Sequence, residues 1–168
     1  MVGVPQSRER YFVVGVHESI EKEFVFPEQQ ELYAPKLSTV LETDVDDKFL
    51  VPEDRARNVI EEAKSKVELQ GVHACLTPAR PKRQNGPRAK SVEKEMFTLT
   101  AQDRHGVITE DFKVRKLTPR EYARLQAFPE SYEIVVSDSQ AYKQFGNAVT
   151  TTVSQAIAER IRMFLLSL

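Results

Sequence analysis

Two stretches of the chain repeat apolar residues at helical spacing and predict amphipathic helices. In residues 54–69, Asp54 is a candidate N-cap and Gly71 lies just beyond the end, and the repeat consists of Ala56, Val59, Ile60, Ala63 and Val67. In residues 148–166 the repeat consists of Val149, Val153, Ala156, Ile157, Ile161, Phe164 and Leu165. This second stretch predicts the longest helix, and residues 142–145 predict a short helical piece before it.

Shorter apolar runs predict strands. Tyr11–Val16 is β-branched and aromatic and lies between polar segments, which is typical of a buried strand. Residues 97–101 resemble a second short strand, followed by a turn at residues 102–106 that leads into Val107. Between residues 24 and 54, three prolines and an acidic run favour loops and short pieces over a long helix.

A capping box predicts the start of a further helix at Thr118. Thr118 accepts from the amide three residues on, Pro119 suits the first helical position, and Glu121 reaches back to the cap. Pro129 is expected to end this helix. Arg120 and Arg124 are four residues apart on one face, so each needs a nearby carboxylate.

Composition narrows the class of protein. A chain of 168 residues with 40% hydrophobic and 29% charged residues predicts one domain, or one domain with a small lobe. It contains no apolar stretch of about 18 residues, and its N-terminus turns polar and charged within the first ten residues, which disfavours a membrane span and a secretory signal. We therefore expect a cytoplasmic protein. A single cysteine, Cys75, and three scattered histidines disfavour disulfide and zinc architectures.

The charge is unevenly distributed. Residues 1–72 carry 9 basic and 15 acidic side chains, whereas residues 73–168 carry 15 and 10, so the net charge of −1 conceals an acidic first part and a basic second part. Residues 78–90 hold five basic residues, three prolines and no acid, and they predict an exposed loop. Composition alone leaves two interpretations open: a loop that contacts phosphates, or a solvated charged loop.

Three blocks of sequence carry a resemblance to a known family. They are Gly3-Val-Pro-Gln-Ser-Arg-Glu-Arg10, the run from Arg115 through Leu-Thr-Pro-Arg-Glu to Pro129, and Ala141-Tyr-Lys-Gln-Phe-Gly-Asn-Ala-Val149. In this order and spacing they resemble the last three conserved motifs of the cytosine-5 DNA methyltransferases. About ninety intervening residues occupy the place of that family's variable target recognition region, and residues 97–100 resemble its threonine-containing segment.

The resemblance implies an α/β fold, namely the C-terminal fragment of a Rossmann-like S-adenosylmethionine-dependent methyltransferase with a small mixed α+β target recognition lobe. Residues 1–22 would end the catalytic sheet, residues 23–113 would form the target recognition region, and residues 114–168 would return to the catalytic and cofactor domain. The family opens with a glycine-rich cofactor loop, a Pro-Cys-Gln nucleophile and a Glu-Asn-Val segment, none of which occurs in this chain. Cys75 stands in His-Ala-Cys-Leu and is interpreted as an ordinary structural cysteine.

The resemblance also implies roles for individual residues. Arg10 would contact the ring oxygen of a flipped cytosine and Arg8 the nearby backbone; the alternative is a pair of structural arginines. Asn147 and the backbone amide of Ala148 would hold the amino-acid end of S-adenosylmethionine; the alternative is a helix cap at a Gly146 turn. Gln6, Arg8 and Arg10 alternate, so in an extended segment they would project to one DNA-facing surface. The candidate DNA-binding residues are Gln6, Arg8, Arg80, Lys82, Arg83, Arg88, Thr98 and Thr100.

These expectations combine into one hypothesis with two alternatives. The chain would be the C-terminal part or second subunit of a DNA (cytosine-5-)-methyltransferase, inactive alone and partnered by double-stranded DNA and a complementary N-terminal half. Without that half it would expose apolar surface or self-associate, whereas a compact monomer is the competing outcome. The alternatives are a non-catalytic DNA-binding or assembly module and a decayed remnant of such an enzyme.

Overall fold

The computed structural model describes residues 3–28, 35–66, 73–76, 89–90, 94–101 and 105–168. Its centre is a three-stranded antiparallel sheet of β1 (His73–Leu76), β2 (His105–Ile108) and β3 (Val114–Lys116), in the order β1-β2-β3. Two 3-10 turns, η1 (Leu37–Val40) and η2 (Asp47–Phe49), and α1 (Glu53–Lys66) come before the sheet in the chain. Three helices follow it, α2 (Pro119–Leu125), α3 (Asp138–Asn147) and α4 (Thr151–Leu165).

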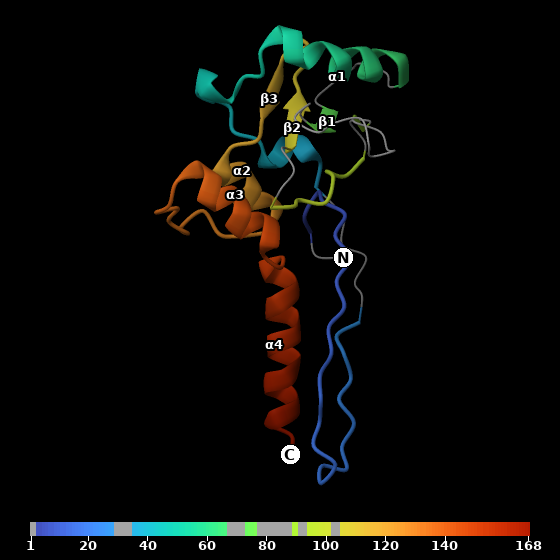
Figure 1. The fold of residues 1–168 in the computed structure, drawn as a ribbon. Helices are drawn as coiled ribbons and strands as arrows, with labels where there is room; N and C mark the ends of the chain where they lie inside the picture. The colour runs from blue at the N-terminus through green and yellow to red at the C-terminus, as the bar shows by residue number, and fades with distance from the viewer. Residues whose placement is uncertain (1–2, 29–34, 67–72, 77–88, 91–93, 102–104) are drawn as a thin grey trace.

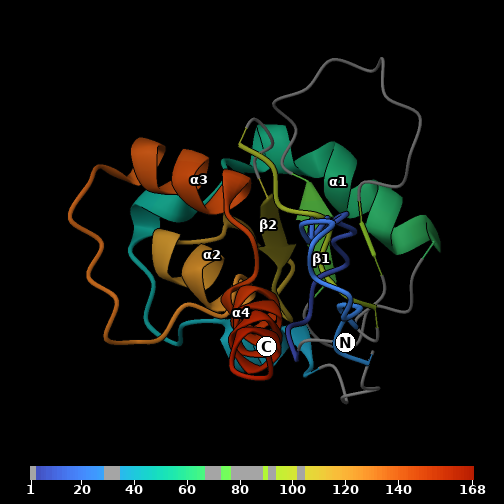
Figure 2. The same cartoon turned by 90° about the horizontal axis from the view of Figure 1, so that it is seen from below.

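The sheet separates two apolar clusters, because neighbouring residues of a strand point to opposite faces. On one face, Cys75 and Ile108 pack with α1 residues; the cluster consists of Ala56, Val59, Ala63, Cys75, Ala89, Ile108 and Val114. On the other face, Ala74 and Val107 pack with η1, α2 and α3. Figure 2 shows α1 on one side of the sheet and α2 with α3 on the other. We call this assembly of the sheet, η1, η2, α1, α2 and α3 the lobe.

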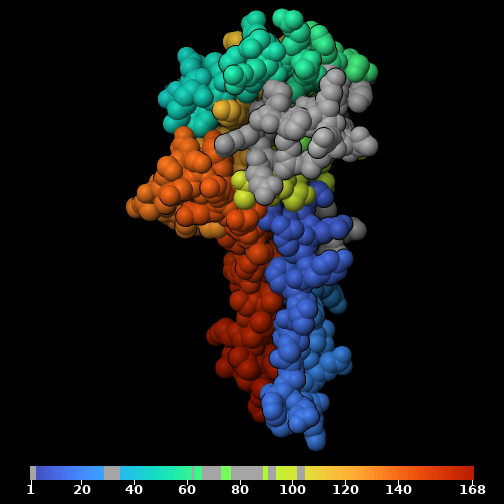
Figure 3. Space-filling view, viewed as in Figure 1, coloured from blue at the N-terminus to red at the C-terminus, as the bar shows by residue number. Residues whose placement is uncertain are grey.

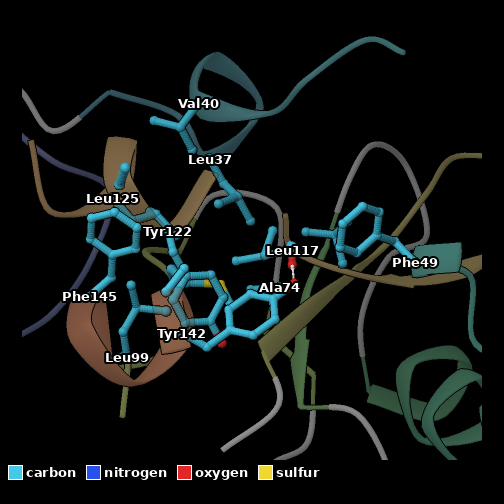
Figure 4. Packing of buried hydrophobic residues seen from close by; sticks show 14 residues of the cluster. Leu37, Val40, Phe49, Ala74, Leu99, Leu117, Tyr122, Leu125, Tyr142 and Phe145 are labelled. Carbon is cyan, nitrogen blue, oxygen red and sulfur yellow. Dashed lines mark hydrogen bonds between the residues drawn. The ribbon is translucent and has the colours of Figure 1, made fainter. Parts of the chain in front are cut away.

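The larger cluster contains the four buried aromatic residues Phe49, Tyr122, Tyr142 and Phe145. Figure 4 shows Tyr122 of α2 beside Tyr142 of α3, and their ring centroids are 4.8 Å apart in an edge-to-face arrangement. The buried Tyr142 hydroxyl donates to the Leu117 carbonyl at 2.7 Å, which satisfies its polar end inside the core. Leu99 and Phe145 complete this packing and tie residues 96–101 to α3.

Helix α4 leaves the lobe together with an extended segment, residues 7–28, which runs out along it and back (Figures 1 and 3). We call α4 and residues 7–28 the stalk. The rings of Phe24 and Phe164 lie 5.5 Å apart, and the Arg160 guanidinium donates to the Val25 carbonyl at 2.9 Å. No residue of α4 is buried. These interactions hold the helix to the segment but leave most of the stalk surface uncovered.

The helices match the sequence patterns closely. The predicted helix over residues 54–69 is α1, with Asp54 inside its first turn rather than at the cap, and residues 67–69 lie outside the described residues. Both hydrogen bonds of the Thr118–Glu121 capping box are present, which confirms it. Helix α2 ends at Leu125, before Pro129, because Ala127 adopts a left-handed φ of 58°. The long C-terminal helix is confirmed as α4.

The predictions of strands at residues 11–16 and 97–101 are wrong. Residues 11–16 are extended but pair with no strand among the described residues, and Tyr11 and Val13 are 98% and 93% exposed. Residues 97–101 form no strand either; nearby, a single parallel bridge joins Gln6 to Met96. A strand needs a hydrogen-bonded neighbour, and the run of apolar residues predicts the extended conformation without supplying one. None of the described helices is long and apolar enough to cross a membrane.

Candidate functional site

The three motif blocks meet where the lobe joins the stalk. Residues 5–8 lie against Met96, with the Met96 amide donating to the Pro5 carbonyl at 2.7 Å. The ends of α2 and α3 and the start of α4 converge on the same place. Segments separated by more than ninety residues in the chain are therefore held together by hydrogen bonds, and each predicted site residue can be located relative to them.

Gln6 is buried and its carboxamide is fully used inside the protein. Its Nε2 donates to the Leu125 carbonyl at 2.8 Å and to Gln126 Oε1 at 3.2 Å, and its Oε1 accepts from the Leu99 amide at 3.2 Å. The sequence predicted that Gln6, Arg8 and Arg10 project to one DNA-facing surface. The structure does not form that shared face, because Gln6 points into the protein whereas Arg10 is exposed.

Arg8 bridges two parts of the chain. Its guanidinium donates through Nη2 to the Gly146 carbonyl at 2.9 Å and through Nη1 to the Leu99 carbonyl. Partial burial, and then repulsion from Arg10, lowers the pKa of Arg8 from its usual value. Both acceptors are backbone carbonyls of this chain, so Arg8 has a structural role here, as the alternative interpretation of the two arginines expects.

Arg10 lies one step further along the stalk. It is exposed, and Nη1 donates only to the carbonyl of the preceding Glu9 at 2.7 Å, a local contact that leaves the guanidinium accessible. Thr98 is exposed, and its hydroxyl donates to the Ser7 carbonyl, whereas Thr100 is half-buried and its amide donates to His105 Nε2 at 3.3 Å. Arg80, Lys82, Arg83 and Arg88 lie outside the described residues.

The elbow between α3 and α4 holds the other predicted site residues. Asn147 is the last residue of α3 and is exposed, so its carboxamide is accessible to a ligand. The Ala148 amide donates to the Phe145 carbonyl at 3.3 Å, so it is engaged within the protein instead of facing outward as predicted. The Thr151 amide at the start of α4 donates to the Gln126 carbonyl at 2.9 Å. Of the two predicted residues, only Asn147 offers a donor and an acceptor to a bound molecule.

Gly146 is required by a close approach at this elbow. A Cβ added at Gly146 would lie 2.5 Å from the carbonyl carbon of Thr100 and 2.5 Å from the Ala101 amide nitrogen. Backbone atoms cannot move aside as a flexible side chain can, so α3 and residues 100–101 can only touch at a residue without a side chain. The sequence predicted a tight Gly146 turn; the structure places this glycine inside a helix that packs on another segment.

Sequence reasoning missed Gln126. Its side chain is fully buried, with Nε2 donating to the Phe145 carbonyl at 2.7 Å and Oε1 accepting from the Thr150 hydroxyl at 3.1 Å. The available signal was a single polar residue within the apolar run Leu-Gln-Ala-Phe at the end of α2. Glutamine side chains are mostly exposed in proteins, so the full burial of Gln126 identifies it as a residue with a specific structural role.

A second network orders the start of α2. Glu121 is fully buried and accepts from Arg115 Nη1 and Nη2 at 2.8 and 2.6 Å, from the Thr118 amide at 2.7 Å and from the Glu42 amide at 2.9 Å. Arg124 is instead paired with Glu130 at 2.7 Å, and Glu130 has a pKa below its usual value because Arg124 donates to it. Arg124 therefore has the carboxylate partner that the sequence predicts for it, whereas Arg120 donates to the Tyr132 carbonyl at 2.9 Å. The Arg115–Glu121 pair ties β3 to the start of α2 and so stabilises the lobe.

Cys75 is confirmed as a structural cysteine. It lies on β1 against α1, has no exposed surface, and burial raises the pKa of its thiol well above the usual value. A protonated, inaccessible thiol is a poor nucleophile. Among the described residues, no cluster of three or more His, Cys, Asp or Glu side chains could hold a metal ion.

A groove lies elsewhere, on the lobe. It has a volume of about 840 Å³, runs between α1 and the β2–β3 turn, and contains none of the predicted site residues. Its floor is apolar, and its rim carries both acidic and basic side chains, including Glu53, Arg57 and Lys113.

Two solved structures share the fold of this chain. The chain superposes on the methyltransferase EhMeth of Entamoeba histolytica with a TM-score of 0.51, at 15% identity over 98% of this chain and 51% of EhMeth. It superposes on DNMT2 of Spodoptera frugiperda with a TM-score of 0.55, at 18% identity over 96% of this chain and 54% of DNMT2. These likenesses show the α/β fold of methyltransferases.

The sequence comparisons then identify the family. Residues 1–163 match the family model "C-5 cytosine-specific DNA methylase", and the chain belongs to this family. It is 35% identical to the type II methyltransferase M.DsaV of Dactylococcopsis salina over 96% of this chain and 45% of that relative. It is 34% identical to the type II methyltransferase M.HpaII of Haemophilus parainfluenzae over 95% of this chain and 47% of that relative. The chain therefore spans about half the length of these curated relatives.

Family membership implies S-adenosylmethionine as the cofactor, which supplies the methyl group. The exposed Asn147 carboxamide can donate to a carboxylate and accept from an ammonium group, which are the two groups at the amino-acid end of the cofactor.

Proposed function

We propose that this chain is the C-terminal part, or second subunit, of a DNA (cytosine-5-)-methyltransferase. It would bind double-stranded DNA and complete the pockets for the flipped cytosine and for S-adenosylmethionine. A complementary half would supply the Pro-Cys-Gln nucleophile and the glycine-rich cofactor loop. Our working division of the chain keeps the end of the catalytic domain in residues 1–22, without the predicted strand, the target recognition region in residues 23–113, and the returning helices in residues 114–168.

The uncovered stalk is the observation that carries this proposal. Its segment of residues 11–16 exposes Tyr11 and Val13 almost fully, and its helix α4 buries no residue. Met163, Leu165 and Leu166 of the same helix end are 58%, 60% and 74% exposed. Exposed apolar side chains on both segments of the stalk favour an interface, because burial of apolar surface returns roughly 25 cal/mol per Å². A chain of half the family length with such a surface is expected to have a partner that covers it.

Individual residues then take roles that their positions support. The exposed Arg10 would donate to the ring oxygen of the flipped cytosine while a nucleophile from the other half adds to the ring. Thr98 is exposed, is bonded to Ser7 three residues before Arg10, and would face the DNA. Asn147 would hold the amino-acid end of the cofactor. Arg80, Lys82, Arg83 and Arg88 would contact phosphates, as their charge predicts.

Reconstitution tests the proposal. We would mix this chain with the part of M.DsaV, and separately of M.HpaII, that it does not match, and measure transfer of labelled methyl groups to cytosine C5 in duplex DNA. Methyl transfer is expected only in the mixtures, and only when the partner keeps its Pro-Cys-Gln cysteine. Transfer by this chain alone would show that the nucleophile does not have to come from another half.

Variants of the reconstituted enzyme separate chemistry from binding. Arg10→Ala is expected to slow methyl transfer far more than it weakens duplex binding, because base polarisation acts in the transition state. Arg55→Ala, at an exposed position of α1, is the matched control and should change neither. Neutralising Arg80, Lys82 and Arg83 together should weaken binding and reduce the slope of log K against log salt by about 0.9 for each phosphate that these side chains neutralise. Equal losses of rate and binding in both sets would refute this division.

One observation favours the alternative of a DNA-binding or assembly module. The lobe packs its own two-sided core and does not use the stalk to do so. A lobe that folds alone can bind DNA without any catalytic partner. Specific duplex binding by the isolated chain, together with no methyl transfer in any mixture, would support the module over the enzyme.

A further inference from the structure

Three buried polar side chains link the lobe to the stalk. Gln6, Gln126 and Thr150 are 8%, 0% and 5% exposed, and Gln126 Oε1 accepts from both of the others. Gln6 and Gln126 are 120 residues apart in the sequence. We call these three residues the amide junction.

The amide junction is fully satisfied. Gln6 uses its Nε2 on the Leu125 carbonyl and its Oε1 on the Leu99 amide, and Gln126 uses its Nε2 on the Phe145 carbonyl. A buried amide costs free energy unless it is hydrogen-bonded, and an apolar side chain would fill the same space without that requirement. Unlike apolar contacts, the hydrogen bonds of these amides are directional, so each bond fixes the position of one backbone group.

Those backbone groups belong to every element that meets at the elbow. The junction holds the end of α2 through Leu125, the end of α3 through Phe145, and residues 96–101 through Leu99. It also holds the first turn of α4, since Thr150 precedes that helix and the Thr151 amide donates to the Gln126 carbonyl. Only residues 148–150 join α3 to α4 along the chain.

Thr150 contributes to this junction instead of capping α4. Its hydroxyl makes no capping bond to the helix and is directed to Gln126. The preferred use of a threonine at this position is to accept from the second or third amide of its helix. Helix α4 therefore lacks the stabilisation of a side-chain cap, and the Thr150 hydroxyl instead connects the start of α4 to Gln126 at the end of α2.

We propose that Gln126 is a positioning residue that sets the direction in which the stalk leaves the lobe. On the proposed function, on which this second step rests, the lobe binds DNA and carries Asn147 of the cofactor pocket, while the stalk carries Arg10 of the base pocket. Gln126 would therefore act on methyl transfer through the alignment of these two parts and without touching DNA, base or cofactor. Loss of the junction should leave DNA binding by the lobe in place and slow the chemical step.

The first test uses the chain alone and measures alignment. Cysteines introduced at the exposed Asn58 of α1 and Ser154 of α4 would carry spin labels, and Cys75 is too buried to react. Dipolar spectroscopy then gives the distribution of label distances between lobe and stalk. Gln126→Leu is expected to broaden or shift this distribution. Gln155→Leu makes the same change at an exposed position of α4, where the Gln155 side chain donates to Glu159 of the same helix, and should leave it unchanged.

A milder pair of variants guards against misfolding. Thr150→Val removes the hydroxyl at nearly constant volume, whereas Thr150→Ser keeps it. Because the hydroxyl makes no capping bond, a change in Thr150→Val that Thr150→Ser restores reports on the bond to Gln126. An unchanged distance distribution in both Gln126→Leu and Thr150→Val overturns the proposal, whatever the enzyme activity.

The second test uses the reconstituted enzyme. Misplacement of reacting groups by about 1 Å can cost on the order of 100-fold in rate, so Gln126→Leu should lower kcat by up to that factor while the affinity for duplex DNA stays within about two-fold. A parallel fall of kcat and DNA affinity would indicate general loss of folding and would overturn the positioning role. A broadened distance distribution with an inactive wild-type mixture would instead uphold the positioning role and refute the proposed enzyme.

Discussion

Glu121→Gln is expected to be among the most damaging single substitutions in the lobe. The Glu121 carboxylate is fully buried and accepts four hydrogen bonds, two from Arg115 and two from backbone amides. Glutamine has the same size but replaces one oxygen by an NH₂ group. That group would face donors on one side of the network, and the charge of Arg115, itself only 7% exposed, would lose its partner.

The magnitude follows from burial. Removing one partner of a buried ion pair costs about 3–5 kcal/mol, because the remaining charge stays desolvated. A domain of this size has about 5–15 kcal/mol of stability in total, so the variant would lose a large part of it. Glu130→Gln is the matched control: Glu130 pairs with Arg124 at the surface, where such a pair contributes at most about 1 kcal/mol.

Urea unfolding followed by circular dichroism measures both variants. The free energies are compared only if the dependence on urea is unchanged, since a changed slope signals a different unfolding reaction. We expect Glu121→Gln to lower the midpoint strongly and Glu130→Gln to leave it nearly in place. A loss below about 1 kcal/mol for Glu121→Gln, or equal losses for both, would mean that the network is not held by the buried charge pair.

Four further outcomes are expected. Gly146→Ala should destabilise the chain by about 1–3 kcal/mol in the same assay, because its methyl group would meet the backbone of residues 100–101. Cys75 should react with a thiol reagent only at the rate of unfolding, and rapid labelling of the native chain would contradict its burial. Asp111 should titrate with a pKa of about 2 by NMR, since Lys113 and Thr109 donate to its carboxylate; this folded pKa lies below the unfolded value, so the stabilisation is present above about pH 4 and lost as the pH falls toward 2. The isolated chain should self-associate or bind an apolar-sensitive dye, as light scattering across a concentration series would show, and a monodisperse, dye-silent monomer would mean that the stalk closes its own surface.

The elements that the sequence predicts correctly are those determined within a few residues. The capping box at Thr118 needs only Glu121, and the apolar stripe of α1 needs only helical spacing and a surface to cover. The strand at residues 11–16 fails because a strand is defined by its neighbour, and no described segment pairs with it. The apolar pattern there predicts burial, whereas Tyr11 and Val13 are exposed in this chain.

The candidate site also has features that local sequence predicts and features that depend on distant segments. The motifs predict which residues belong to the site, but the direction of each side chain depends on contacts from distant segments. Gln6 is predicted to face DNA because it alternates with Arg8 and Arg10; its burial depends on Leu125 and Gln126, more than a hundred residues away. No local pattern contains that information. Arg10 stays exposed and keeps its predicted role as a proposal.

The amide junction separates the lobe, whose core is covered, from the stalk, whose apolar side chains are exposed. On the lobe side, both faces of the sheet are covered and the buried charge of Arg115 is paired. On the stalk side, α4 buries nothing and Tyr11 is 98% exposed. A flexible joint at this boundary would let a partner that binds the stalk move independently of the lobe. The buried and fully bonded amides make the joint stiff instead, so a partner that covers the stalk would fix its own position relative to whatever the lobe binds.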